Sequence, residues 1–282
     1  YLDHLVGVFG QPVAENPGVV IQDAAFRALG LERWRYLTLD VDKDKLGDAI
    51  RGLKALKMRG VNCTIPQKIA VMEYLDEISE RARLIGAVNQ IVNDNGRLYG
   101  DNTDGKGFMM SLQSSGIDVR GKRAVVFGAG GAARAICVEM ALAGAVDITI
   151  VCRPRGRALG EALVEIVQKN TQTAVRCEDW VGEHSIPAGT DIVVNATPVG
   201  LYPNVGDLPK IALDSITPDM FVQDIIPNPT ETALVKEMRR RGIPCATGAG
   251  MLIEQAALNI EMWTGQKPDR SVMLQALEEA LA

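Results

Sequence analysis

The feature that most constrains the fold of this chain is a glycine-rich turn between a buried strand and a helix. The segment Arg123–Phe127 is apolar after its first residue and runs into Gly128-Ala129-Gly130-Gly131 and an alanine-rich helix. The spacing G-x-G-x-x-A lets the backbone approach a pyrophosphate, whose charge is met by free N–H groups at the helix start. The turn predicts a dinucleotide site; the alternative is a small-residue contact between helix and strand. The predicted contacts are Gly128, Ala129, Gly130, Gly131 and Ala132.

The next predicted strand, Asp147–Val151, indicates which dinucleotide binds. NAD-binding proteins usually place an acidic residue at the end of this strand, for the ribose 2′-hydroxyl. Here the strand is followed by Cys152 and then by Arg153, Arg155 and Arg157. Guanidinium groups suit a 2′-phosphate, so NADP is predicted rather than NAD, with Arg153 nearest the phosphate. The alternative is that these arginines only solvate a helix start.

Two units of alternating strands and helices are predicted along the chain. Because a parallel crossover needs a long connection, this alternation favours parallel sheets covered by helices, an α/β fold. An Asn-Gly hairpin signal at Val88–Tyr99 lies between the units. The expected elements are strands near Leu5–Phe9, Tyr36–Leu39 and Gly60–Ile65 with helices near Val19–Leu29 and Lys43–Leu56, and then strands at Arg123–Phe127, Asp147–Val151, Asp191–Ala196 and Phe221–Ile226.

Composition excludes several classes of protein. The 282 residues are 47% hydrophobic, enough for a full core, and the net charge of -5 without a basic block disfavours a nucleic-acid partner. The cluster Arg239–Arg241 closes a predicted helix, where cations are favourable. The five cysteines show no metal or disulfide spacing, so no metal is expected. No apolar run is long enough to span a membrane and no signal-peptide layout is present, so a cytoplasmic location is expected.

Three polar segments follow apolar strands or precede helices, where packing alone does not explain them. They are Gly60–Lys68, Gly86–Asn89 and Asn102–Gly105. Each has a plainer interpretation: Lys68 can be a solvated lysine after a proline, and residues 102–104 can simply cap a helix. Their order along the chain, G-x-N-x-T-x-P-x-K, G-A-V-N and N-T-D-G before the glycine-rich turn, resembles the shikimate dehydrogenase family.

The resemblance extends over nearly the whole chain. Further matching positions are Asn195-Ala196-Thr197 with Gly200, then Asp224, Pro229 and Thr232, and finally Gly248–Leu252 with Gln255 and Trp263-Thr264-Gly265. It implies a two-domain fold in which residues 1–104, completed by the C-terminal helices of 248–282, bind substrate and residues 105–247 form a Rossmann-type NADP domain. The active site is expected in the cleft between them, with a role in aromatic amino acid biosynthesis.

The resemblance also implies roles for individual residues. Lys68 and Asp104 are the expected catalytic pair, and Asn62 supports the lysine loop. The expected substrate contacts are Asn16, Thr64, Asn89 and Gln255, and Thr197 and Gly248 join the cofactor site. The chemistry is coherent: oxidising a secondary alcohol requires a group that accepts the hydroxyl proton while hydride leaves the carbon. A lysine can accept it, and a nearby carboxylate can orient the lysine.

The sequence departs from the family at the expected carboxylate-binding motif. Asn16 and Gly18 replace two serines, and Glu15 adds a repelling charge if it points inward. Pro227 also replaces an expected tyrosine. Shikimate is therefore expected alongside quinate, an amino-substituted analogue or another cyclic polyol acid, with NAD in place of NADP in some of these enzymes. A folate dehydrogenase and a non-catalytic NADP-binding regulator are further alternatives. The partner is a small molecule, and the chain is a monomer or a homodimer.

Overall fold

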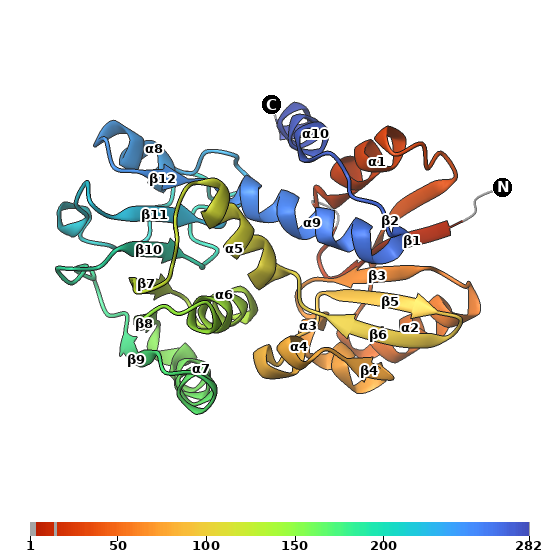
Figure 1. Cartoon of the computed structure of the whole chain (residues 1–282), viewed down its shortest axis with the longest axis horizontal. Helices are drawn as coiled ribbons and strands as arrows, with labels where there is room; N and C mark the ends of the chain where they lie inside the picture. The colour runs from red at the N-terminus through yellow and green to blue at the C-terminus, as the bar shows by residue number, and fades with distance from the viewer. Residues whose placement is uncertain (1–3, 14–15, 282) are drawn as a thin grey trace. The chain divides into compact units, whose positions relative to one another are not determined.

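The computed structural model describes residues 4–13 and 16–281, which divide into two compact units. The first unit holds the N-terminal residues as far as Gly107 together with Ile253–Ala280, and the second holds Phe108–Leu252. The chain enters the second unit within helix α5 (Asp104–Ser114) and returns within helix α9 (Gly248–Thr264) (Figure 1). The α/β class predicted from the sequence is confirmed.

The first unit contains a mixed sheet of strand order β2-β1-β3-β5-β6-β4. Strands β2, β1 and β3 are parallel, as predicted, but β5 pairs antiparallel with both β3 and β6. The hairpin that we expected between the units thus belongs to this sheet. Asn95 and Gly96 both have positive φ, so the chain turns back at once and no crossover is possible. The strands are β1 (His4–Gly10), β2 (Trp34–Asp40), β3 (Gly60–Cys63), β4 (Glu77–Ile78), β5 (Gln90–Asp94) and β6 (Arg97–Asp101).

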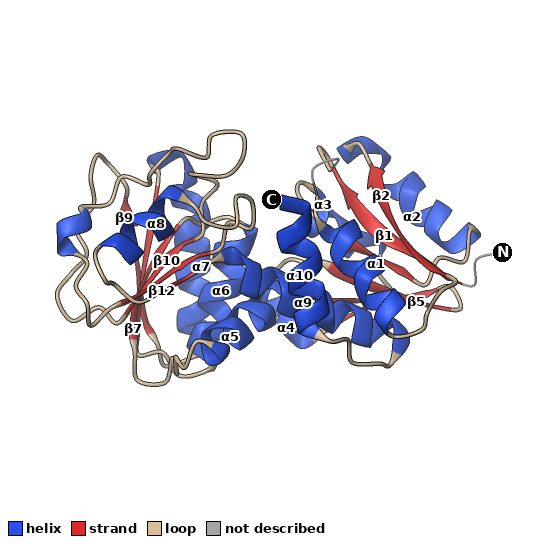
Figure 2. Cartoon of the chain, turned by 90° about the horizontal axis from the view of Figure 1, so that it is seen from above, coloured by secondary structure: helices blue, strands red, loops and turns tan. Residues whose placement is uncertain are grey.

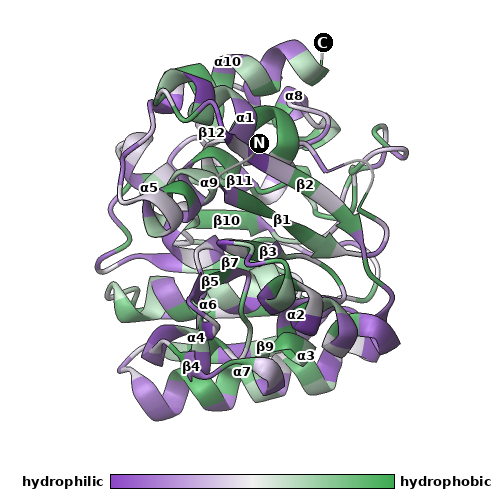
Figure 3. Cartoon of the chain, turned by 90° about the vertical axis from the view of Figure 1, so that its right-hand side faces the viewer, coloured by the Kyte–Doolittle hydropathy of each residue, from purple (hydrophilic) through white to green (hydrophobic). Residues whose placement is uncertain are grey.

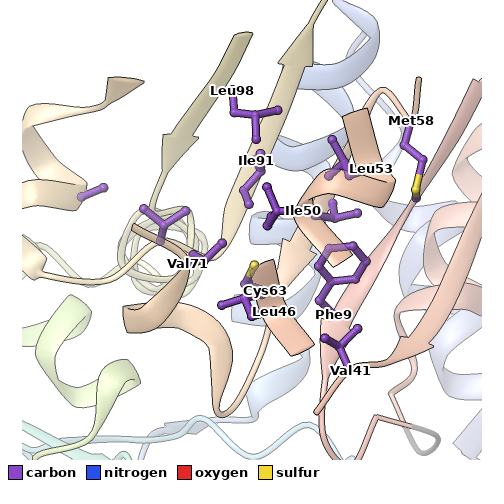
Figure 4. Packing of buried hydrophobic residues seen from close by; sticks show 13 residues of the cluster. Phe9, Val41, Leu46, Ile50, Leu53, Met58, Cys63, Val71, Ile91 and Leu98 are labelled. Atoms are coloured by element: carbon purple, nitrogen blue, oxygen red, sulfur yellow. The ribbon is translucent and has the colours of Figure 1, made fainter. Parts of the chain in front are cut away.

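Helix α2 covers one face of this sheet. Its buried residues Leu46, Ile50 and Leu53 follow helical spacing and belong to one cluster with Phe9 and Val61 of the strands (Figure 4). The helix predicted for 43–56 forms as a 3₁₀ turn and an α-helix. The helical segments of this unit are α1 (Gly18–Ala28), η1 (Lys43–Lys45), α2 (Leu46–Ala55), α3 (Gln67–Ala70), η2 (Val71–Tyr74), α4 (Glu80–Ile85) and α10 (Arg270–Leu281).

The second unit contains a wholly parallel sheet of strand order β12-β11-β10-β7-β8-β9. The chain starts in the middle at β7, winds outward to β9, and then returns to β10 on the other side of β7. The carboxyl ends of β7 and β10 therefore form the switch point at which doubly wound folds bind nucleotides. Figure 2 shows the strands of this sheet with helices on either side. The strands are β7 (Arg123–Phe127), β8 (Asp147–Cys152), β9 (Ala174–Asp179), β10 (Ile192–Asn195), β11 (Phe221–Asp224) and β12 (Cys245–Ala246).

Strand β9 is an element that the sequence did not predict. It lies at the sheet edge and buries only Val175, so its apolar signal is weak. Every residue of β10 and β11 is buried, and β10 is mainly hydrophobic (Figure 3). The helical segments are α6 (Gly131–Leu142), η3 (Pro154–Gly156), α7 (Arg157–Asn170), η4 (Leu213–Ser215) and α8 (Ala233–Arg240). Arg240 and Arg241, at the end of α8, bind the carboxylate of Glu237. Among the helices described, none is long and apolar enough to cross a membrane.

Candidate active site

Lys68 and Asp104 form an ion pair in the first unit. The Nζ of Lys68 lies 2.7 Å from Oδ2 of Asp104, and their side chains are 21% and 6% exposed. Lys68 sits in the short helix α3 after β3, and its carbonyl accepts the N–H of Val88. The neighbouring Gln67 is buried and donates from Nε2 to the carbonyl of Val41, which fixes this turn. The pair predicted from the sequence is thus assembled across 36 residues of chain.

The helix that begins at Asp104 is capped by a different residue. The side-chain oxygen of Asn102 accepts the backbone N–H groups of Asp104 (3.1 Å) and Gly105 (3.4 Å). Asn102 is held in turn by a bond from its Nδ2 to the carbonyl of Ala87. Because Asn102 satisfies the helix end, the carboxylate of Asp104 is not used as a cap and points to other side chains.

Asn89 connects this pair to Gln255 of α9. Its Oδ1 accepts the backbone N–H of Thr103 at 2.7 Å, so its Nδ2 faces Oδ1 of Asp104 (2.9 Å) and Oε1 of Gln255 (3.1 Å). Since Gln255 uses its oxygen in this bond, its Nε2 donors are directed elsewhere. Asn89 is only 2% exposed, and its polar atoms are satisfied within the cluster. The structure therefore brings four predicted site residues together, the pair Lys68 and Asp104 with Asn89 and Gln255.

Asn62 lies in β3, just before the loop that carries Lys68, and its side chain is held by three hydrogen bonds. Its Nδ2 donates to the carbonyl of Asn89 (3.1 Å) and to Oε1 of Gln90 (2.6 Å), and its Oδ1 accepts the hydroxyl of Tyr36 (2.9 Å). Burial raises the pKa of Tyr36 well above its ordinary value, so the phenol stays protonated and remains a donor. A continuous buried network thus underlies the predicted site.

Thr64 follows β3 on the same loop. A Cβ at Gly10 would lie 2.2 Å from the Thr64 methyl carbon, so only glycine allows this approach. The methyl group faces Gly10, and no residue in the described part of the chain hydrogen-bonds the Thr64 hydroxyl. That hydroxyl is therefore open to a ligand.

Asn16 and Gly18, which replace the expected serines, form a local turn. Oδ1 of Asn16 accepts the N–H of Gly18 at 2.8 Å, which leaves Nδ2 of Asn16 as the outward donor. A Cβ at Gly18 would lie 2.7 Å from that Oδ1 and 3.3 Å from the hydroxyl of Tyr36. Glu15, whose charge we expected beside this turn, lies outside the described residues.

The glycine-rich turn of the second unit is formed as predicted. Gly128 has φ +112, and a Cβ there would lie 2.7 Å from the carbonyl oxygen of Ala196. Gly130 is extended and begins α6 with no side-chain cap, so the first N–H groups of the helix are unsatisfied. A Cβ at Gly130 or Gly131 would meet nothing within 4 Å. This open cradle of backbone donors fits a pyrophosphate.

Thr197 lies at the neighbouring strand end, after β10. Its N–H and hydroxyl both donate to Oδ1 of Asn195, at 3.2 and 2.7 Å. Asn195 and Thr232 in turn donate to the buried carboxylate of Asp224, at 3.1 and 2.7 Å. Burial raises the pKa of Asp224 to about 6, although these hydrogen bonds oppose the rise. The network fixes the loop that carries Thr197.

Gly248, the other predicted cofactor residue outside the turn, begins α9. A Cβ there would lie 2.4 Å from the carbonyl oxygens of Ile225 and Ile226, so glycine is required where the helix start meets the end of β11. The helix start is thus held against a strand end on the carboxyl side of the parallel sheet.

The arginines after β8 divide into two groups. Arg157 is engaged by Glu161 at 2.8 Å and by Asp179 at 3.2 Å. Arg153 and Arg155 are exposed, and no ion pair or hydrogen bond engages their side chains within the described chain. Three arginines were predicted as candidates for binding a 2′-phosphate, and Arg153 and Arg155 are the two that are available to do so. Residues 4–13 and 16–281 contain no group of three acidic, histidine or cysteine side chains that could hold a metal.

Thr103 and Asn259 are two site residues that the sequence did not predict separately. The hydroxyl of Thr103 lies 2.8 Å from Oδ1 of Asn259, a buried residue of α9. Thr103 was visible only as part of the motif around Asp104. Asn259 could have been noticed in the sequence because it is a single polar residue near Ala256, Ala257 and Ile260, in an otherwise apolar stretch of a helix.

Known proteins resemble the chain along its length. Residues 8–91 match the family model described as shikimate dehydrogenase substrate binding domain, and residues 248–278 match the shikimate 5′-dehydrogenase C-terminal domain. A shikimate dehydrogenase (NADP(+)) of Desulforamulus reducens is 39% identical and aligns over 98% of this chain and 95% of that protein.

Two solved structures extend the comparison. The ligand-free 5-ketofructose reductase of Gluconobacter sp. strain CHM43 has a TM-score of 0.91 and 43% identity, with 98% of both chains covered. Shikimate 5-dehydrogenase of Thermus thermophilus, in complex with NADP(H) and shikimate, has a TM-score of 0.85 and 33% identity, and covers 99% of this chain and 100% of that chain.

Proposed function

Because the chain belongs to the shikimate dehydrogenase family, we propose that it is an NADP-dependent oxidoreductase that interconverts a ring hydroxyl and a ketone of shikimate or a closely related cyclic hydroxy acid. The observation that carries the proposal is the shielded ion pair between Lys68 and Asp104, oriented by Asn89. A lysine that only solvated the surface would not need a buried carboxylate whose other oxygen is also hydrogen-bonded.

The chemistry follows from the pair. In the direction of ketone reduction, the Lys68 ammonium donates a proton to the oxygen as the carbon is reduced; in alcohol oxidation, the amine of Lys68 accepts the hydroxyl proton. Asp104 holds the lysine in position through Oδ2, while its Oδ1 is held by Asn89. NADP, when bound, supplies or accepts the hydride. Loss of the positioned proton carrier should therefore slow both directions.

The second unit has the features that NADP needs. Backbone donors at residues 129–132 would hold the pyrophosphate, and Arg153 and Arg155 would bind the 2′-phosphate. The N–H of Gly128 already donates to the carbonyl of Val151 at 2.8 Å, so Gly128 serves the site by shaping the turn. Thr197 and Gly248 complete the strand-end loops of this site. NADP is the expected cofactor because β8 ends at Cys152 and Arg153 without a carboxylate for a ribose 2′-hydroxyl.

The substrate side of the proposal rests on the first unit. Among the described residues, nothing engages the hydroxyl of Thr64 or the amide nitrogen of Gln255, and both groups suit the hydroxyls of a polyol. Asn16 would contact the far end of the substrate. We assign substrate binding to residues 1–104 with 248–282 and NADP binding to 105–247. We expect a monomer or homodimer in the cytoplasm, with no nucleic-acid partner.

A second candidate substrate is a neutral polyhydroxy ketone. Asn16 and Gly18 offer one amide donor and no hydroxyl where two serines would grip a carboxylate, and Oδ1 of Asn16 is already bound to Gly18. The similar 5-ketofructose reductase is named for a substrate without a carboxylate. This alternative changes the substrate and leaves the roles of Lys68 and Asp104 as they are.

A substrate panel tests both candidates. The purified chain is mixed with shikimate, quinate or fructose and either NADP or NAD, and with 5-ketofructose and NADPH, while absorbance of the reduced cofactor is followed. The main proposal predicts the highest kcat/KM with shikimate and NADP. Highest kcat/KM with 5-ketofructose would favour the neutral substrate, and no turnover in any mixture would contradict an NADP-dependent dehydrogenase on these substrates.

A further inference from the structure

Asn259 is a buried amide on an otherwise apolar stretch of α9. It is 2% exposed, and Ala256, Ala257 and Ile260 beside it are also buried. Its backbone carbonyl accepts Nε2 of Gln90 at 3.4 Å. A buried polar side chain is costly unless it is hydrogen-bonded, so its bonds identify what it does. The side-chain oxygen of Asn259 accepts the hydroxyl of Thr103, the residue before Asp104.

In the bond between Thr103 and Asn259, the Thr103 hydroxyl is the donor. Thr103 has one hydroxyl proton and two acceptor oxygens within range: Oδ1 of Asn259 at 2.8 Å and Oδ1 of Asn89 at 3.3 Å. The shorter bond takes the proton, so the lone pairs of the hydroxyl face Nδ2 of Asn89 at 2.9 Å. The backbone N–H of Thr103 separately occupies Oδ1 of Asn89 at 2.7 Å. Both contacts favour one orientation of the Asn89 amide.

We propose that Asn259 is a positioning residue that acts through the Thr103 hydroxyl to hold the amide of Asn89 in place, and thereby holds Asp104 against Lys68. The inference rests on the proposed function, because it concerns the pair that carries the proton. Asn259 itself contacts neither Lys68 nor Asp104, and acts on them through Thr103 and Asn89.

Losing Asn259 should loosen the Asn89 amide without reversing it. The backbone N–H of Thr103 still holds Oδ1 of Asn89, and reversal would place that oxygen against Oδ1 of Asp104 and Oε1 of Gln255 with no proton between them. Without Asn259, the Thr103 hydroxyl is free to donate to Asn89 and to remove the acceptor that Nδ2 of Asn89 now faces. The amide can then shift, and the Asp104 carboxylate that it holds moves away from Lys68. Asn259 thus keeps the pair in the geometry needed for proton transfer.

Variants at both positions test this mechanism. Asn259→Ala should lower kcat about tenfold, the effect of one lost hydrogen bond in the reacting geometry, with KM nearly unchanged. Thr103→Val should lower kcat by a similar factor, and the double variant should be no slower than Thr103→Val alone. Thr103→Ser keeps the hydroxyl and should retain kcat.

Asn93→Ala is the matched control. Asn93 is also a buried asparagine of the first unit, but it bonds to the carbonyl of Met58 and the N–H of Gly96. Its loss should lower the melting temperature without lowering kcat. Equal losses of kcat in the Asn93 and Asn259 variants, additive losses in the double variant, or a wild-type kcat for Asn259→Ala would each overturn the proposal.

A crystal structure of Asn259→Ala gives a readout that needs no turnover. We expect the distances from Asn89 Nδ2 to Thr103 Oγ1 and Asp104 Oδ1 to exceed the 2.9 Å of the parent, and the Lys68 Nζ to Asp104 Oδ2 distance to exceed 2.7 Å. An unchanged pair would contradict the inference. If the parent enzyme turns over no substrate but the variant shows this displacement, the proposed function fails while the structural role of Asn259 stands.

Discussion

The two units build their parts of the site by different means. The predicted site of the first unit depends on side-chain identity: Lys68, Asp104 and Asn89 are joined by directed hydrogen bonds of 2.7 and 2.9 Å. The predicted site of the second unit depends on backbone shape, because Gly128 turns the chain at positive φ and Gly130 begins α6 without a side-chain cap. We therefore expect substitutions in the first unit to change turnover, and substitutions in the second to change cofactor affinity.

The two units also differ in the surroundings of a buried carboxylate, Asp104 in the first and Asp224 in the second. Asp104 has a cation beside it, whereas the described neighbours of Asp224 are the neutral donors Asn195, Thr232 and the N–H of Ile226. A buried carboxylate that faces a lysine can take part in proton transfer. A buried carboxylate that faces only neutral donors can fix a loop, but its ionised form is destabilised because no opposite charge lies beside it.

The largest expected effect is on Lys68. Lys68→Ala should lower kcat by about 10²–10⁴-fold, because it removes the proton carrier of the reaction. Substrate affinity, measured by equilibrium binding, should stay within about tenfold, since the lysine is needed mainly in the transition state. Lys106→Ala is a suitable control, because Lys106 pairs with Asp101 at 2.6 Å. Near-normal turnover in the Lys68 variant would refute the catalytic assignment.

The next effect concerns stability of the second unit. The pKa of Asp224 is raised to about 6 in the folded state from 3.8, so its protonated form is favoured there. The stabilising contribution is present below pH 3.8 and is lost as pH rises through about 6, amounting to about 3 kcal/mol. Relative to the parent, Asp224→Asn should become more stable by about this amount between pH 4 and 7.5.

Denaturant unfolding of both proteins across that range measures the difference. Asp147→Asn serves as the control, because Asp147 is paired with Arg176 at 2.9 Å on partly exposed side chains. A constant stability difference between the parent and Asp224→Asn at all pH values would show that Asp224 does not titrate in this window.

A smaller effect is expected at Arg153. Arg153→Ala should weaken NADP by about 1.5–3 kcal/mol, the value of one hydrogen-bonded charged contact, and should leave NAD unaffected. Arg157→Ala is the matched control, because Arg157 is already engaged by Glu161 and Asp179. Titration of each variant with both cofactors gives the four affinities. Equal weakening of NADP and NAD by Arg153→Ala would place this residue away from the 2′-phosphate.

The smallest effect concerns the substituted turn. Asn16→Ser with Gly18→Ser adds two hydroxyl donors, each contributing about 0.5–3 kcal/mol to binding of a carboxylate. KM for shikimate should fall while kcat stays unchanged, because such contacts are equal in the ground and transition states. A neutral substrate should not gain. If shikimate kinetics do not improve, the substrate has no carboxylate at this turn, and the neutral candidate is strengthened.

The sequence by itself determined the local features. Strand–helix alternation, the Gly128–Gly131 turn and the missing acid after β8 are encoded in short stretches, because periodicity and glycine conformation act over a few residues. They predicted the α/β class, which the structure confirms, and NADP. The motifs at Lys68 and Asp104 named the catalytic candidates by resemblance.

The tertiary structure decided what depends on distant partners. It placed the hairpin in the first sheet, committed Arg157 to Asp179, and joined Lys68 to Asp104. It alone showed that Asn259 reaches Thr103 across 156 residues. The physical reason is that a hydrogen bond depends on where two atoms lie in the folded chain, whereas local sequence patterns record only how a segment shields its own apolar face.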